Sequence, residues 1–206
     1  MNWQPLEKDQ LDILLSAVAS KGMPGLFSLE SSKAQFAELP FYNGYALYDL
    51  RNYSTLPVFT MQYLGDGKDF YYLDGSADPI YQVNRKPGAL NLNQDTALDY
   101  LSFFFSHVAI LGETEETEMI RDPESLPYYD YLSENQKTVI RAEKDAAHVE
   151  YNSAGNSFIV ESPLYYGGSL VKARIEIDKI GHVMVKDYKL LFGMSVRSDR
   201  QGTTAS

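Results

Sequence analysis

The strongest constraint on the fold is a ten-residue segment, 169–178, in which apolar and polar side chains alternate. The apolar residues at every second position are Val171, Ala173, Ile175 and Ile177. The opposite set comprises Leu170, Lys172, Arg174, Glu176 and Asp178. A period of two places one set against a core and the other in water, as in an antiparallel strand with one exposed face. The turn-like tetrapeptide 178–181 follows, and a second extended segment begins at His182, which predicts an antiparallel hairpin.

The remaining patterns predict a mixed α+β chain. An N-terminal helix is expected to have Pro5 in its first turn and one apolar stripe, formed by Leu11, Leu14, Leu15 and Val18. Strands are predicted near 44–50, 57–64 and 70–73, and a short extended piece at 80–83. From residue 147 a meander of four strands is predicted at 147–152, 157–165, 169–178 and 182–190.

A central helix is predicted after Asn93, which can cap it. Its apolar residues are Leu98, Tyr100, Leu101, Phe103, Phe104, Phe105 and Val108. They leave so little polar surface that the helix must be buried. The segment 134–146 stays open between helix and strand, because Ser133 and Gln136 can form a capping box whereas 138–140 favours a strand. We predict one α+β domain over 1–193, with an antiparallel meander curled around or packed on the buried helix, and a flexible tail at 194–206.

Composition excludes several function classes. The net charge of −10, from 28 acidic and 18 basic residues, repels phosphate backbones, so we expect no nucleic-acid partner. The chain has no cysteine, which removes disulfides, thiolate nucleophiles and cysteine metal sites. It has no apolar run of about 18 residues for a membrane helix and no secretory signal pattern, so we predict a cytoplasmic protein that binds no membrane. No cofactor is expected.

Three segments together carry a resemblance. They are FYYLDGSADPIYQVN (70–84), LNLNQDTALDYLSFFFSHV (90–108) and YYGGSLVKARIEIDKIGHVMVKDYKLL (165–191). In this order they resemble a family of bacterial proteins to which no activity is assigned. The resemblance covers residues 70–191 and implies a bacterial cytoplasmic protein. It implies no catalytic residue.

Motifs for catalysis or metal binding are few. Candidate acid–base groups are His107, in the last turn of the predicted helix where the helix dipole favours a protonated ring, and Asp99. The alternative for His107 is a local hydrogen bond at the end of the helix. Four carboxylates in two neighbouring loops are candidate cation ligands, but Asp is also an ordinary turn residue. These are Asp66, Asp69, Asp74 and Asp78.

Sixteen tyrosines, several of them in adjacent pairs, point to protein binding. Tyrosine is frequent at interface hot spots, and an acidic loop can complement a basic partner. The candidate interaction residues are Tyr71, Tyr72, Tyr128, Tyr129, Glu115 and Glu116.

Three hypotheses on function follow. The first is a non-enzymatic protein-interaction protein, of the inhibitor or immunity kind. The alternative is a small-molecule-binding protein or cofactor-free enzyme with a pocket between the sheet and the central helix. A third possibility is a subunit of a larger assembly, which an exposed apolar strip on the meander would favour.

Overall fold

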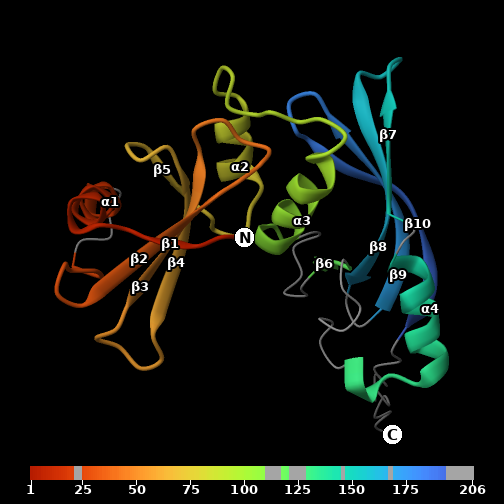
Figure 1. Cartoon of the computed structure of the whole chain (residues 1–206), viewed down its shortest axis with the longest axis horizontal. Helices are drawn as coiled ribbons and strands as arrows, with labels where there is room; N and C mark the ends of the chain where they lie inside the picture. The colour runs from red at the N-terminus through yellow and green to blue at the C-terminus, as the bar shows by residue number, and fades with distance from the viewer. Residues whose placement is uncertain (21–24, 110–116, 121–128, 145–146, 167–168, 194–206) are drawn as a thin grey trace, which may run out of the picture.

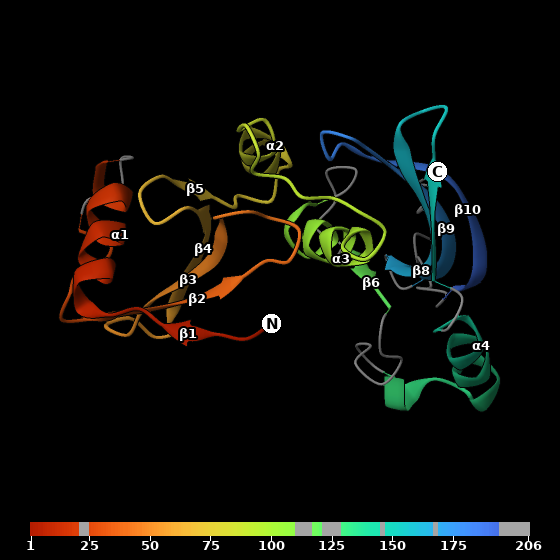
Figure 2. The same cartoon turned by 45° about the horizontal axis from the view of Figure 1, so that its top comes forward.

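In the computed structural model, helix α3 (Ala97–His107) lies between two antiparallel sheets (Figures 1 and 2). The structure describes residues 1–20, 25–109, 117–120, 129–144, 147–166 and 169–193. Its main core runs from the first sheet across α3 into the second sheet. Among the described helices, none is both long enough and apolar enough to cross a membrane.

The first sheet has the strand order β1-β2-β3-β4-β5. Its strands are β1 (Gln4–Pro5), β2 (Ser32–Glu38), β3 (Ala46–Asn52), β4 (Phe59–Gly65) and β5 (Phe70–Tyr72). Each strand pairs antiparallel with the next, and the predicted β4–β5 hairpin is confirmed by the pairing of Gly65 with Phe70.

The N-terminal helix α1 (Lys8–Ser20) packs on this sheet through a core cluster of its own. The buried residues of its stripe are Leu11, Leu14 and Val18, as the spacing predicts. Pro5 does not lie in the helix: it belongs to β1, where it pairs with Gln35. A residue without an N–H is tolerated at an edge strand, which explains why the prediction for Pro5 was wrong.

The segment 80–83, predicted to be extended, is instead part of helix α2 (Asp78–Asn84). Pro79 stands in the first turn, where its missing N–H costs no hydrogen bond. Asp78 lies beside it at the positive end of the helix dipole. These two start signals outweigh the β-propensity of the apolar residues that follow.

Helix α3 is buried on nearly every side, as predicted. Its buried side chains are Ala97, Tyr100, Leu101, Phe103, Phe104 and Phe105. Asn93 caps the turn that leads into α3, because its side-chain oxygen accepts the N–H groups of Asp95 (2.9 Å) and Thr96 (3.1 Å). On the side of the first sheet, the ring of Phe41 lies 5.3 Å from that of Tyr100 and 5.4 Å from that of Phe103.

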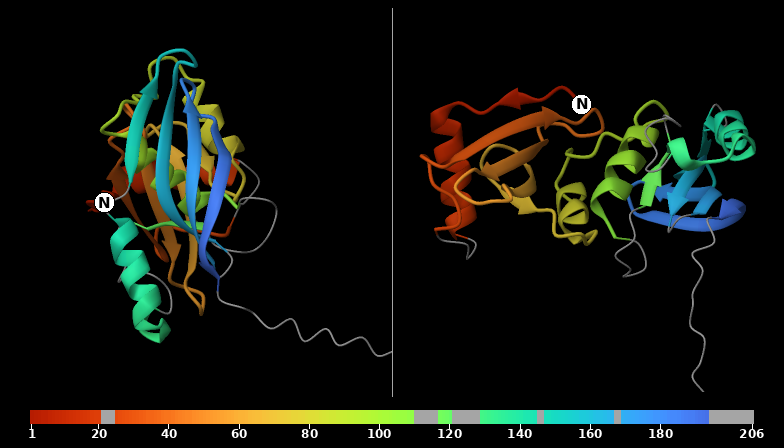
Figure 3. Two further views of the ribbon diagram at one scale, coloured as in Figure 1. Left: turned by 90° about the vertical axis from the view of Figure 1, so that its right-hand side faces the viewer. Right: turned by 90° about the horizontal axis from the view of Figure 1, so that it is seen from below.

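The second sheet contains the predicted meander. Its strands are β6 (Thr117–Met119), β7 (His148–Asn152), β8 (Ser157–Tyr166), β9 (Ser169–Asp178) and β10 (Val183–Gly193). The order is β10-β9-β8, and the far edge of β8 pairs with both β7 and β6 (Figure 3). The alternating residues 171, 173, 175 and 177 of β9 are buried in the main core with α3. The α+β class and the packing of a meander on a buried helix are confirmed.

The outer face of the second sheet is partly covered by helix α4 (Glu134–Lys144), which follows the short helix η3 (Tyr129–Tyr131). Ser133 and Gln136 form the reciprocal capping box, so the helical alternative for 134–146 is correct over 134–144. Leu170, expected on the wet face, is fully buried in a small cluster with Tyr129 and Ile140. The alternation of apolar and polar residues along β9 could not predict that α4 would pack over Leu170.

Candidate functional site

The predicted acid–base pair is not brought together by α3. Asp99 and His107 are eight residues apart on one helix, which separates them by about 12 Å along its axis. His107 Nδ1 lies 2.7 Å from the Phe103 carbonyl oxygen, and since a carbonyl only accepts, the ring donates. Burial lowers the pKa of His107 and outweighs the effect of that carbonyl. The effect predicted for the helix dipole is therefore outweighed by burial. The alternative prediction for His107, a local hydrogen bond at the end of the helix, is the one that the structure confirms.

The four candidate cation ligands form turns. Asp66 Oδ1 accepts the N–H groups of Lys68 (2.9 Å) and Asp69 (2.8 Å). Asp74 Oδ1 accepts the N–H and hydroxyl of Ser76, and these two bonds hold the pKa of Asp74 below its ordinary value. Asp78 begins α2. Among the described residues, no three His, Asp or Glu side chains are grouped as metal ligands would be.

The predicted interaction residues are scattered. Tyr72 is 38% exposed on β5, with its ring 5.6 Å from that of Tyr63, while Tyr71 is half-buried beside Lys86. Tyr129 is buried, with the cationic ends of Lys137 and Arg141 over its ring, and so belongs to the core beneath α4. Tyr128, Glu115 and Glu116 lie outside the described residues.

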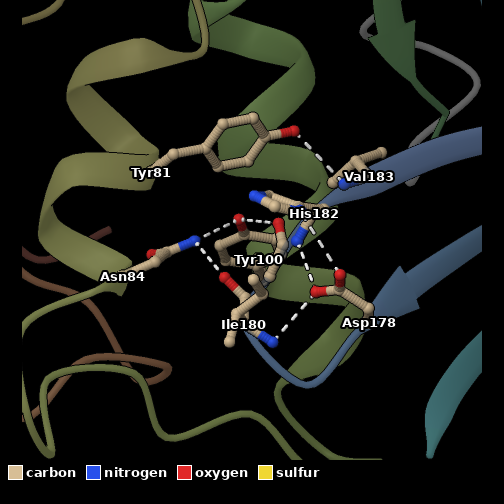
Figure 4. A network of polar contacts seen from close by, with 8 residues as sticks. Tyr81, Asn84, Tyr100, Asp178, Ile180, His182 and Val183 are labelled. Atoms are coloured by element: carbon tan, nitrogen blue, oxygen red, sulfur yellow. Dashed lines mark hydrogen bonds and ion pairs between the residues drawn. The ribbon is translucent and has the colours of Figure 1, made fainter.

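A polar network joins α2 and α3 to the β9–β10 turn (Figure 4). The Tyr100 hydroxyl donates to the Gly181 carbonyl (2.5 Å) and accepts from the Asn84 amide (2.9 Å). The same amide also donates to the Ile180 carbonyl (3.1 Å), and Tyr42 donates to Asn84 Oδ1 (2.6 Å). Burial raises the pKa of both tyrosines, so both hydroxyls stay neutral donors.

The exposed side of this network holds the turn from outside. His182 Nδ1 lies 3.2 Å from Asp178 Oδ2, and the backbone N–H of His182 donates to Asp178 Oδ1 (2.9 Å). The Tyr81 ring stands edge-on to the imidazole at 4.6 Å, and its hydroxyl accepts the Val183 N–H. These contacts join elements far apart in the sequence, so the network is best understood as a structural clamp.

A shallow depression of about 420 Å³ lies at one end of β2 and β3. Its lining residues are Glu30, Ser31, Ser32, Lys33, Tyr53 and Ser54. None of them belongs to α3 or to the second sheet. The predicted pocket between a sheet and the central helix is a different place, and there the buried side chains of α3 pack into the main core.

Strand β10 exposes a row of side chains to solvent. Seven consecutive residues of this 11-residue strand, 184–190, are exposed. It forms one edge of the second sheet and pairs with no described strand besides β9 (Figure 3). Four large apolar side chains are exposed on it: Met184 (57%), Val185 (38%), Tyr188 (68%) and Leu190 (58%).

Three of these side chains continue the core face of the sheet. Val185, Tyr188 and Leu190 lie opposite Ile175, Ala173 and Val171 of β9. Directly opposite residues project to the same face, so these three extend the buried face of β9 past the cover of α3. We call Val185, Tyr188 and Leu190 the β10 strip. An apolar surface of this kind commonly marks an interaction site.

Comparison with known proteins gives no relative: no family model, curated protein or solved structure matches the chain. The resemblance to a bacterial family therefore stays a prediction. Function is inferred from the geometry alone.

Sequence reasoning missed the β10 strip. A strand was predicted over 182–190, where the structure has β10 over 183–193. The sequence of β10, VMVKDYKLLFG, does not alternate cleanly between apolar and polar residues, and its register with β9 shifts twice. A signal was available in the sequence: three consecutive apolar residues, 190–192, directly follow the mostly polar stretch 186–189. This pattern is typical neither of a strand buried on both faces nor of one with an exposed polar face.

Proposed function

We propose that the protein is a non-enzymatic binding protein that engages another polypeptide through β10. The exposure of β10 and its strip carries the proposal. A strand edge offers a row of N–H and C=O groups for pairing, and the strip adds apolar area on one face. This is also the observation that favours a subunit of a larger assembly.

The other sheet edges lend support by contrast. The first sheet ends in β1, of two residues, and β5, of three. Along β8 the second sheet ends in β7, of five residues, and β6, of three. Short edge strands protect folded proteins from unwanted pairing, and β10, with 11 residues, departs from that practice. Such a departure is expected where pairing is used.

A catalytic function finds less support. The candidate acid–base residues are apart, the polar network has satisfied partners, and the depression on the first sheet lies near neither. The predicted cytoplasmic location, the bacterial origin and the lack of nucleic-acid binding are compatible with this proposal and stay predictions.

The test is native mass spectrometry of the protein recovered gently from its own cells. We expect the wild type to retain a second polypeptide chain, either foreign or identical. Leu190→Ser with Tyr188→Ser should lose it, because both changes remove exposed apolar contact area without opening the core.

The matched control is Leu56→Ser, at an apolar side chain that is 97% exposed in the loop between β3 and β4. This variant should keep the second chain. Equal retention by the β10 variant would show that binding uses another surface, and a bare wild-type monomer would contradict the proposal.

A further inference from the structure

We propose that β10 pairs with β10 of a second copy of this chain, antiparallel and with Tyr188 opposite Tyr188. This inference rests on the proposed function and names its partner. A two-fold axis makes such an interface self-complementary, so the same residues must suit both sides. The residues around Tyr188 meet that requirement.

Two-fold symmetric pairing of one strand with itself always places some residue opposite its own copy. Centred on Tyr188, the pairing sets Asp187 of each copy opposite Lys189 of the other. Centred one residue earlier or later, it sets Asp187 opposite Asp187 or Lys189 opposite Lys189. Opposite charges across a strand pair stabilise and like charges destabilise, so among these three registers the charges favour the one centred on Tyr188.

Both charged residues are available for this role. Each is exposed, and neither forms an ion pair with any described residue. Lys189 lies opposite Lys172 of β9, whose amine is already held by Glu143 at 3.1 Å. A carboxylate from outside would relieve this like-charge pair, and Asp187 of a second copy supplies it.

The backbone and the strip fit the same register. The Tyr188 N–H donates to Oδ1 of its neighbour Asp187 (2.8 Å), which indicates that this N–H points away from β9. In the pair it would instead donate to the Tyr188 carbonyl of the other copy. On the core face, Tyr188 of one copy would lie opposite Tyr188 of the other, and Leu190 of each copy would lie diagonally next to the Tyr188 of its partner. These contacts would remove exposed apolar area that the monomer leaves in water.

The test is sedimentation velocity on the purified full chain, from about 1 to about 200 µM, because an edge pairing of this size is a modest interface. We expect the wild type to dimerise within this range. Asp187→Lys and Lys189→Asp should each weaken the dimer by about tenfold or more, since symmetry turns both ion pairs into like-charge pairs.

Two rescue measurements make the test specific. The double variant Asp187→Lys/Lys189→Asp should dimerise like the wild type, and an equimolar mixture of the two single variants should form heterodimers. A wild type that stays monomeric at about 200 µM overturns the inference. So do single variants that dimerise normally or a mixture that does not recover.

The outcomes separate this inference from the proposed function. A monomeric purified chain that still retains a foreign polypeptide from cells, lost in the β10 variant, would refute self-pairing alone. A foreign polypeptide retained equally by the β10 variant would refute the proposed function.

Discussion

The two parts of the β9–β10 hairpin differ in how they are held. At the turn, residues 178–183 are fixed by hydrogen bonds to Tyr81, Asn84 and Tyr100 of two helices (Figure 4). Along the strand, residues 184–190 are exposed, and the outer edge pairs with no described strand. Specific side-chain contacts from the two helices therefore hold the turn that begins β10, whereas the outer edge of the strand beyond residue 183 is exposed and pairs with no described strand.

This arrangement suits a binding strand. A segment fixed at one end and paired along one edge has little conformational freedom left to lose when a partner adds to the other edge. Substitutions at the turn should therefore change stability, while substitutions along the strand should change association.

The largest effect is expected at Gly181. Its φ is +78°, and an added Cβ would clash with Asn84 Nδ2 and come within 2.8 Å of the Tyr100 hydroxyl. Gly181→Ala should cost roughly 3 kcal/mol, combining backbone strain with a clash in the clamp. Urea unfolding followed by the fluorescence of the single tryptophan, Trp3, measures it.

Gly88→Ala is the matched control for that measurement. Gly88 also has a positive φ, +72°, but nothing lies within 4 Å of an added Cβ. It should lose only about 1 kcal/mol, from strain. Equal losses at both glycines would show that the contacts around the turn do not restrict it.

The next largest effect is expected from Tyr100→Phe. Removing the hydroxyl leaves the Gly181 carbonyl and the Asn84 amide each with one partner fewer, at a cost of about 2 kcal/mol. Because burial raises the pKa of Tyr100, the unfolded chain loses this proton first as pH rises above about 10, and stability falls with it. The free energy of unfolding of the Tyr100→Phe variant should therefore fall less steeply with rising pH than that of the wild type. Tyr188→Phe, at an exposed side chain on the open part of the hairpin, should change the free energy of unfolding by less than about 0.5 kcal/mol.

The smallest effect is expected on the strip. Leu190→Ser should alter the free energy of unfolding of the monomer by less than about 0.5 kcal/mol, because the side chain is 58% exposed. Ile175→Ala on the adjacent β9, fully buried, should cost about 3 kcal/mol in the same urea titration. A comparable loss at Leu190 would mean that the strip belongs to the core.

Local sequence signals predicted most of the framework. Alternation gave β9, and apolar spacing gave α1 and α3. They failed where one element depends on another: Leu170 is buried only because α4 covers it, and Pro5 is extended only because β2 accepts it as an edge. The clamp was beyond prediction for the same reason, since Tyr42, Asn84 and Gly181 meet only after the sheets pack on α3.

The position of α3 has a consequence for how the chain unfolds. Side chains of this helix contribute to a core shared by both sheets. Each sheet therefore depends on α3 to keep the core face that it turns toward the helix buried. The first sheet has a second, separate core with α1, and the second sheet has a smaller one beneath α4. Loss of α3 would therefore remove the main core from both sheets at once, and a nascent chain cannot complete this core until β9 has been synthesised.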